Sequence, residues 1–101
     1  MSTVPRLHDA TVETLTLDWA RGVLQIRLSV GINGTGIVTL EATGVHRAVC
    51  PRAFPWGPSD SVNGAKLEQA PEGGLLLSIE MQSGDVLEVY CEEVLVKQAD
   101  E

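Results

Sequence analysis

Apolar and polar residues alternate with a period of two along most of the chain, and a helical period of apolar residues is nearly absent. The segment "VLQIRLSV" (23–30) shows this most clearly, because Leu24, Ile26 and Leu28 fall on one face and polar residues on the other. A period of two is the spacing of side chains along a half-buried β-strand. The pattern therefore predicts an all-β protein.

The same alternation predicts about seven strands joined by short turns. Short links join neighbouring strands only when these run antiparallel, so we expect an antiparallel meander. One apolar face on each strand has to be covered, which favours a small sandwich or a partly open barrel. The expected strands are "TVETLTLDW" (11–19), 23–30, "IVTLEA" (37–42), "VHRAVC" (45–50), "SVNGAKLEQA" (61–70), "LLLSIEMQ" (75–82) and "VLEVYC" (86–91).

Two segments carry finer expectations about which side chains face inward. In the first expected strand the alternation places Leu15, Leu17 and Trp19 together on the apolar face. After the last expected strand the alternation slips by one residue at Glu92 and Glu93. A slip in phase is what a β-bulge produces, so we expect a bulge there.

The hairpin between the strands 75–82 and 86–91 predicts a register. With a three-residue turn at 83–85, Glu80 lies opposite Glu88 on the outer face and Ser78 lies opposite Tyr90. Two carboxylates directly opposite each other repel. One interpretation is a solvated face on which Lys66, diagonal to Glu80, offsets the repulsion. The other is a docking patch of Glu80, Glu88 and Tyr90 for a basic partner.

Charge is distributed unevenly along the chain. It carries 14 acidic and 7 basic residues, for a net charge of −7, and the excess of acids lies in residues 51–101. A nucleic-acid backbone needs clustered lysine and arginine, so nucleic acid is excluded as a partner. A basic protein remains as a partner.

The length of the chain and its lack of recognisable targeting signals predict its domain count and its location in the cell. Its 101 residues suit one β domain, 1–101. The beginning of the chain has no apolar signal region, and no apolar run approaches the roughly 20 residues of a membrane helix. We expect a cytoplasmic protein that contacts no membrane, with Cys50 and Cys91 as buried free thiols.

The stretch "RAFPWGPSDSVN" (52–63) holds the only Phe and one of the two Trp. Its prolines favour extended backbone, so it forms a stiff connector between strands. In one interpretation Phe54 and Trp56 fold back over the open end of the sheet and plug the core. In the other, Trp56 is a partner-binding anchor, with Arg52 and Asp60 on the same stretch.

Catalytic and metal chemistry find little support in the sequence. His8, Asp9 and His46 lack a metal-ligand spacing, and Asp9 suits a cap at the start of the first strand. Ser59 has no histidine partner in a recognisable motif. We expect no catalytic residues, no metal and no cofactor.

Several stretches look familiar. "LHDAT" with "DW", "PWGPS-x-SVN" and "IEMQSGD" resemble a family of small uncharacterised bacterial β proteins, a likeness that spans most of the chain. The "HDA-T" start with a Trp-ended first strand is similar to the opening of some immunity proteins from bacterial toxin systems, over the first third of the chain. The first resemblance implies a bacterial cytoplasmic protein with no assigned reaction. The second implies a non-catalytic inhibitor that binds and masks a toxin.

The sequence favours a non-enzymatic, acidic protein-binding module, whose narrower form is an immunity protein that neutralises a basic toxin. One alternative is a small-ligand or enzymatic domain with a pocket near His8, Asp9 and Ser59 in a curled sheet. Another is a structural homo-oligomer formed through an exposed edge strand or the Trp56 loop. The expected partner-binding residues are Arg52, Trp56, Asp60, Glu80, Glu88 and Tyr90.

Overall fold

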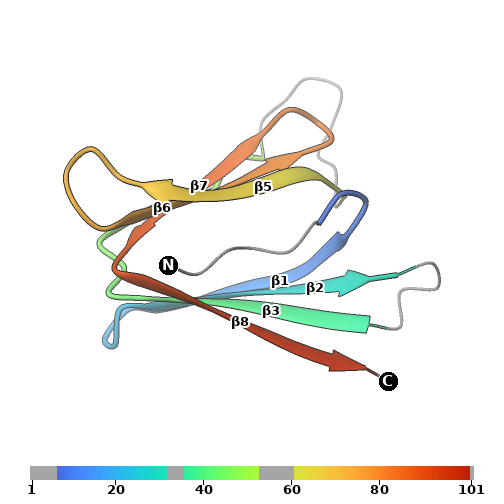
Figure 1. The fold of residues 1–101 in the computed structure, drawn as a ribbon, viewed down its shortest axis with the longest axis horizontal. Helices are drawn as coiled ribbons and strands as arrows, with labels where there is room; N and C mark the ends of the chain where they lie inside the picture. Colours follow the sequence, from blue (N-terminus) through green and yellow to red (C-terminus); the bar gives the residue numbers. More distant parts are fainter. Residues whose placement is uncertain (1–6, 32–35, 53–60, 101) are drawn as a thin grey trace.

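Two antiparallel β-sheets pack face to face, as Figure 1 shows from the side. A computed structural model describes residues 7–31, 36–52 and 61–100. Neither sheet closes into a barrel, so the architecture is a sandwich. The strands are β1 (Thr11–Asp18), β2 (Val23–Val30), β3 (Gly36–Thr43), β4 (Arg47–Val49), β5 (Val62–Gln69), β6 (Leu75–Met81), β7 (Val86–Cys91) and β8 (Glu93–Asp100).

The described part holds eight strands where the sequence predicted about seven. The first sheet has the order β1-β2-β3-β8 and the second has the order β4-β7-β6-β5. The expected meander holds from β1 to β3 and from β5 to β7, where neighbours in sequence are neighbours in the sheet. Two pairings depart from it, because β4 pairs with β7 and β8 pairs with β3.

The phase slip at Glu92 marks a crossing between the sheets, so the expected bulge there is wrong. Cys91 still pairs with Leu75 in the second sheet, whereas Glu93 already pairs with Thr43 in the first. The amide nitrogen of Glu92 donates to the carbonyl oxygen of Thr43 at 2.9 Å. Glu92 therefore carries the chain from one sheet to the other. The inward-facing residues are odd-numbered before it and even-numbered after it.

The core lies between the two sheets and consists mainly of the inward-facing residues that the alternation predicted on β2, β3, β6 and β7, joined by residues of β5 and β8. Leu, Ile and Val make up most of it, as expected for a chain with few aromatic residues. Burying apolar surface in this way is the main favourable contribution to folding. The most completely buried side chains are those of Leu24, Ile26, Leu28, Leu40, Val62, Leu77, Ile79, Val89, Cys91 and Val94.

The apolar residues of β1 are the exception to this burial. Leu15 is 37% exposed and Leu17 is 42% exposed, and Trp19, just beyond the end of β1, is 86% exposed. The expectation that they lie in a covered apolar face is wrong. Since β1 is an edge strand and β4 on the same side of the sandwich has only three residues, little of the second sheet covers this edge.

The two cysteines are free, as predicted, but only Cys91 is buried. Cys50 directly follows the short β4 and is exposed, so the expectation that both thiols are buried is wrong for Cys50. Among the described residues no helix is long and apolar enough to span a membrane.

Candidate interaction surface

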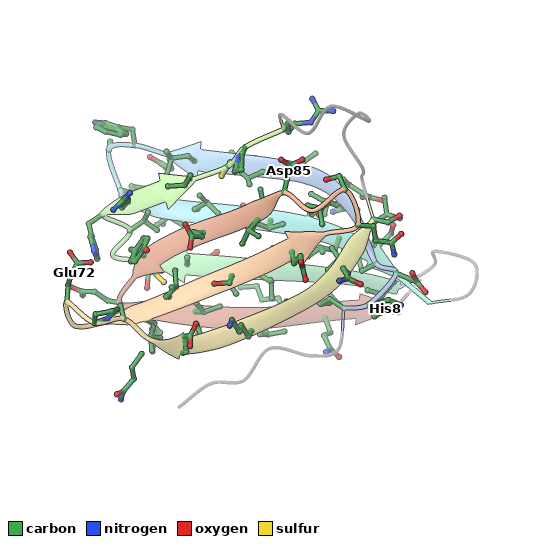
Figure 2. The ribbon with its side chains drawn as sticks, turned by 90° about the horizontal axis from the view of Figure 1, so that it is seen from above. His8, Glu72 and Asp85 are labelled. Atoms are coloured by element: carbon green, nitrogen blue, oxygen red, sulfur yellow. The ribbon has the colours of Figure 1, made fainter. Side chains whose placement is uncertain are left out.

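The outward face of the second sheet carries three of the predicted contact residues. On β6 and β7 the odd-numbered residues point into the core, so Glu80, Glu88 and Tyr90 point outward. Figure 2 views the molecule from above, with the ribbons of this sheet nearest the reader. The outward residues form cross-strand rows, which are Glu68, Leu76, Tyr90 and Arg47, then Lys66, Ser78, Glu88 and Val49, then Gly64, Glu80 and Val86.

The predicted register of the β6–β7 hairpin is wrong by two residues. Glu80 lies opposite Val86, and Glu88 lies opposite Ser78. The turn occupies 82–84, because the amide nitrogen of Met81 donates to the carbonyl oxygen of Asp85 at 2.8 Å. The two glutamates are therefore diagonal neighbours, at a Cα separation of about 7–8 Å, and their mutual repulsion is weaker than predicted.

A hydrogen bond inside the turn explains the shift. The hydroxyl of Ser83 donates to the Asp85 carboxylate at 2.8 Å, and both side chains are buried. Gly84 between them has a φ of +100°, which glycine adopts without strain. This arrangement holds Asp85 beside the turn as the residue opposite Met81, whereas the predicted turn of 83–85 included it.

The partners of the charged residues on this face also differ from the expected ones. Lys66 does lie diagonal to Glu80, but its ammonium group pairs with Glu68, at 3.6 Å between Nζ and Oε1. Glu80 instead accepts a hydrogen bond of 3.1 Å from the side-chain amide of Asn63. The side chain of Glu88 makes no hydrogen bond or ion pair with any residue of the described chain.

An open groove with a volume of about 510 Å³ crosses β5, β6 and β7 on this face. We call it the acidic groove. Its lining includes the small residues Gly64 and Ser78, around which longer side chains stand. These are the charged residues Lys66, Glu68, Glu80 and Glu88 and the apolar residues Leu76 and Val86.

Tyr90 lies beside the acidic groove, next to Leu76 in the same cross-strand row. The guanidinium carbon of Arg47 lies 5.4 Å from the centre of the tyrosine ring, a cation–π contact. The ring of His46 lies 6.2 Å from the same centre. Arg47 was not predicted as a neighbour of this face, because β4 pairs with β7 and not with the strand that follows it in sequence.

The other predicted contact residues do not join this face in the described structure. Arg52 is exposed and lines a separate hollow between the edges of the two sheets, together with Leu15 and Cys50. Trp56 and Asp60 lie outside the described residues, and so does Phe54 of the proposed plug. The structure therefore brings together Glu80, Glu88 and Tyr90 and places Arg52 elsewhere.

At the position where a pocket for small ligands was suggested, His8 and Asp9 contact other parts of the chain. His8 Nδ1 lies 2.8 Å from the carbonyl oxygen of Asn63, and Asp9 Oδ1 accepts a hydrogen bond of 2.6 Å from the side-chain amide of Gln82. Asp9 thus connects the start of β1 to the β6–β7 turn, rather than capping its own strand as predicted. Neither residue lines the acidic groove or the hollow beside Arg52, and Ser59 lies outside the described residues.

Comparison with known proteins adds no family assignment. No protein-family model matches the chain, and no curated protein is significantly similar to it. The resemblances to a small bacterial β family and to immunity proteins stay predictions.

Proposed function

We propose that this protein is a non-enzymatic binding module that holds a basic, extended segment of a partner protein in the acidic groove. The observation that carries the proposal is the position of Glu88. Its carboxylate lines the groove, faces the small side chain of Ser78 and has no charged or hydrogen-bonding partner among the described residues. A cationic side chain that enters the groove would give Glu88 that partner.

The charge balance of the groove supports a basic occupant. Three glutamates and one lysine line it, and the lysine is already paired with Glu68. Such a surface attracts lysine and arginine from a distance and repels acidic segments. The alternative interpretation, a solvated face, requires Lys66 to offset the charge of Glu80. Lys66 pairs with Glu68 instead.

The apolar residues of the groove suit the same occupant. Leu76 and Val86 lie on the outward face, and Val86 is 36% exposed. Lysine and arginine bury their aliphatic stems on apolar surface while the charged ends reach carboxylates. The groove offers both kinds of contact, which favours a basic peptide over a free small cation.

Binding of an oligolysine peptide, measured by calorimetric titration, tests the proposal. We expect the wild-type chain to bind it with an affinity that falls as salt is added, because salt screens exposed charges. Glu88→Lys should raise the dissociation constant at least about tenfold, which is roughly 1.4 kcal/mol. The matched control is Glu93→Lys on β8, an exposed position outside the groove with the same change of charge.

Either of two outcomes contradicts the proposal. One is that the wild-type chain does not bind the peptide. The other is that Glu88→Lys and Glu93→Lys weaken binding equally, since the attraction would then reflect the net charge of −7 and no particular site. Circular dichroism of each variant establishes that the β fold is retained.

The narrower form of the proposal is an immunity protein whose partner is a basic toxin. It rests on the resemblance of the "HDA-T" start to immunity proteins and on the acidic charge of the second half of the chain. Its test is whether the gene directly upstream encodes a toxin that this chain binds and inhibits. A neighbouring product that the chain does not bind would contradict this form.

A further inference from the structure

The free edge of β1 presents apolar side chains that in most strands would be buried. Leu15 and Leu17 share the inward face of this strand, and both are substantially exposed together with Trp19. One side of β1 pairs with β2 along the whole strand. On the opposite side, the described pairing is a single bridge between Thr11, at the start of β1, and Ser61. An edge of this kind presents unpaired backbone groups next to apolar side chains, which is a template for another strand.

The space in front of this edge is hollow. One hollow of about 370 Å³ lies between Leu15 of β1 and Cys50 after β4. A second of about 340 Å³ lies between Leu17, Trp19 and Ala48. Figure 2 shows β1 (blue) and β4 (green) along the same side of the sandwich. The second sheet therefore leaves part of the apolar face of β1 uncovered.

The other three edge strands of the described sandwich carry features that hinder strand addition. β4 is only three residues long, β5 has a register shift after Val62 and carries Lys66, and β8 carries Glu93 and Lys97. Short edges, irregular register and charges are the usual protections against edge-to-edge pairing. In β1 the regular stretch after its early register shift, "TLTL" (14–17), has no charged residue.

The charges around β1 point to the kind of partner. Glu13 pairs with Arg27 at 3.1 Å, and Asp18 pairs with Arg21 at 3.7 Å. The two hollows in front of the strand add the basic residues Arg47 and Arg52 and the acidic residue Asp85, so this edge does not share the excess of acids. Two copies of a chain with a net charge of −7 repel each other over most of their surfaces. This apolar edge, which lacks an excess of acids, is where they can meet with little repulsion, whereas a basic partner is attracted to the acidic groove.

We propose that the β1 edge is the interface of a homodimer in which β1 pairs antiparallel with its own copy. With the two-fold axis at Thr16, Leu15 would lie opposite Leu17 of the partner subunit, and inward faces would join inward faces. This pairing is isologous, as in most symmetric dimers, and it would join the two β1-β2-β3-β8 sheets into one. An interface of two short strands falls below about 1,200 Å² of buried surface, so the dimer is a weak one.

Sedimentation velocity over a wide range of protein concentration tests the proposal. We expect wild-type protein to shift from monomer to dimer as concentration rises. Leu17→Lys should raise the dimer dissociation constant at least about tenfold, because it places a charge opposite an apolar side chain. Gln98→Lys is the matched control, since it adds the same charge on another edge strand, and it should dimerise like wild type.

Thr16→Lys provides the test if Leu17→Lys does not fold, because Thr16 is exposed on the outer face and its replacement leaves the apolar residues in place. It places two lysines opposite each other across the axis and should also weaken the dimer. Hydrogen exchange locates the interface, and amide protection over 14–17 should increase with protein concentration.

Three results would overturn the proposal. They are a wild-type protein that stays monomeric at every concentration, dimers of both lysine variants as strong as wild type, and a dimer without added protection in β1. The test is separate from that of the acidic groove, since Leu17→Lys should leave oligolysine binding unchanged.

Discussion

Gly74 and Cys91 approach so closely that no side chain fits between them. A Cβ atom on Gly74 would lie 2.7 Å from the carbonyl oxygen of Cys91, and the φ of Gly74 is +78°. Gly74 ends the turn between β5 and β6, in which the amide nitrogen of Ala70 donates to its carbonyl oxygen at 3.0 Å. The turn therefore packs directly against the end of β7, where the chain is about to cross between the sheets.

This contact predicts that Gly74→Ala destabilises the fold more than Gly73→Ala. Both glycines have positive φ, at which a side chain costs about 1–2 kcal/mol. Gly73 has open space around its Cα, whereas the clash at Gly74 adds about 1–3 kcal/mol. Urea unfolding of the two variants measures the difference. Equal free energies of unfolding would show that the approach of Cys91 has no energetic consequence.

The exposure of β1 predicts different costs for two leucines on inward faces of the first sheet. Leu40 is fully buried, so Leu40→Ala leaves a cavity and should cost about 2–5 kcal/mol. Leu17 is about half as buried, so Leu17→Ala should cost about 1 kcal/mol. Denaturant unfolding of dilute protein, where the proposed dimer is dissociated, measures both. Similar losses would mean that the edge is covered in solution.

The pKa of Glu41 lies below its ordinary value, because hydrogen bonds from the side chains of Gln25 and Lys97 favour its charged form. A lowered folded-state pKa contributes stability that is complete above the ordinary pKa and is lost as pH falls through the lowered one. Wild-type protein should therefore lose more stability than Glu41→Gln between neutral and acidic pH. Glu93→Gln is the control, since the Glu93 side chain has no partner in the described chain. Parallel pH profiles of wild type and Glu41→Gln would contradict the assignment.

The two thiols should react at different rates with a thiol reagent. Burial raises the pKa of the Cys91 thiol and closes it off, whereas Cys50 is exposed and its pKa is raised by partial desolvation. In the folded chain we expect one reacting thiol, Cys50, with a rate below that of free cysteine at the same pH. Cys91 should react only on unfolding. A Cys50→Ser variant that still shows a reactive thiol in its folded state would contradict this.

The alternation of residues was enough to predict the fold class and most of the core. Leu77, Ile79 and Val89 are buried because each alternate residue of a half-covered strand must face inward, which is a local property of the sequence. Pairing and coverage depend on distant parts of the chain. Leu15 and Leu17 are exposed because β4 is short, and nothing within β1 indicates that.

The residues of the candidate site were predicted only in part, and their arrangement was not predicted. Alternation placed Glu80, Glu88 and Tyr90 on the outward face, but the bond between Ser83 and Asp85 sets a register that counting turn residues could not give. Arg47 reaches Tyr90 through the pairing of β4 with β7, which the sequence did not predict. Asn63 reaches Glu80 from the register shift at the start of the β5–β6 pairing, which the alternation did not predict either.

The central claim is that a basic segment binds in the acidic groove, and the most direct measurement is the map of amide chemical-shift changes when oligolysine is added to ¹⁵N-labelled protein. We expect the largest changes at Gly64, Ser78 and Val86, which line the groove, and little change at residues of β8 such as Val94 and Gln98. Changes spread evenly over both sheets, or concentrated on the first sheet, would contradict the claim.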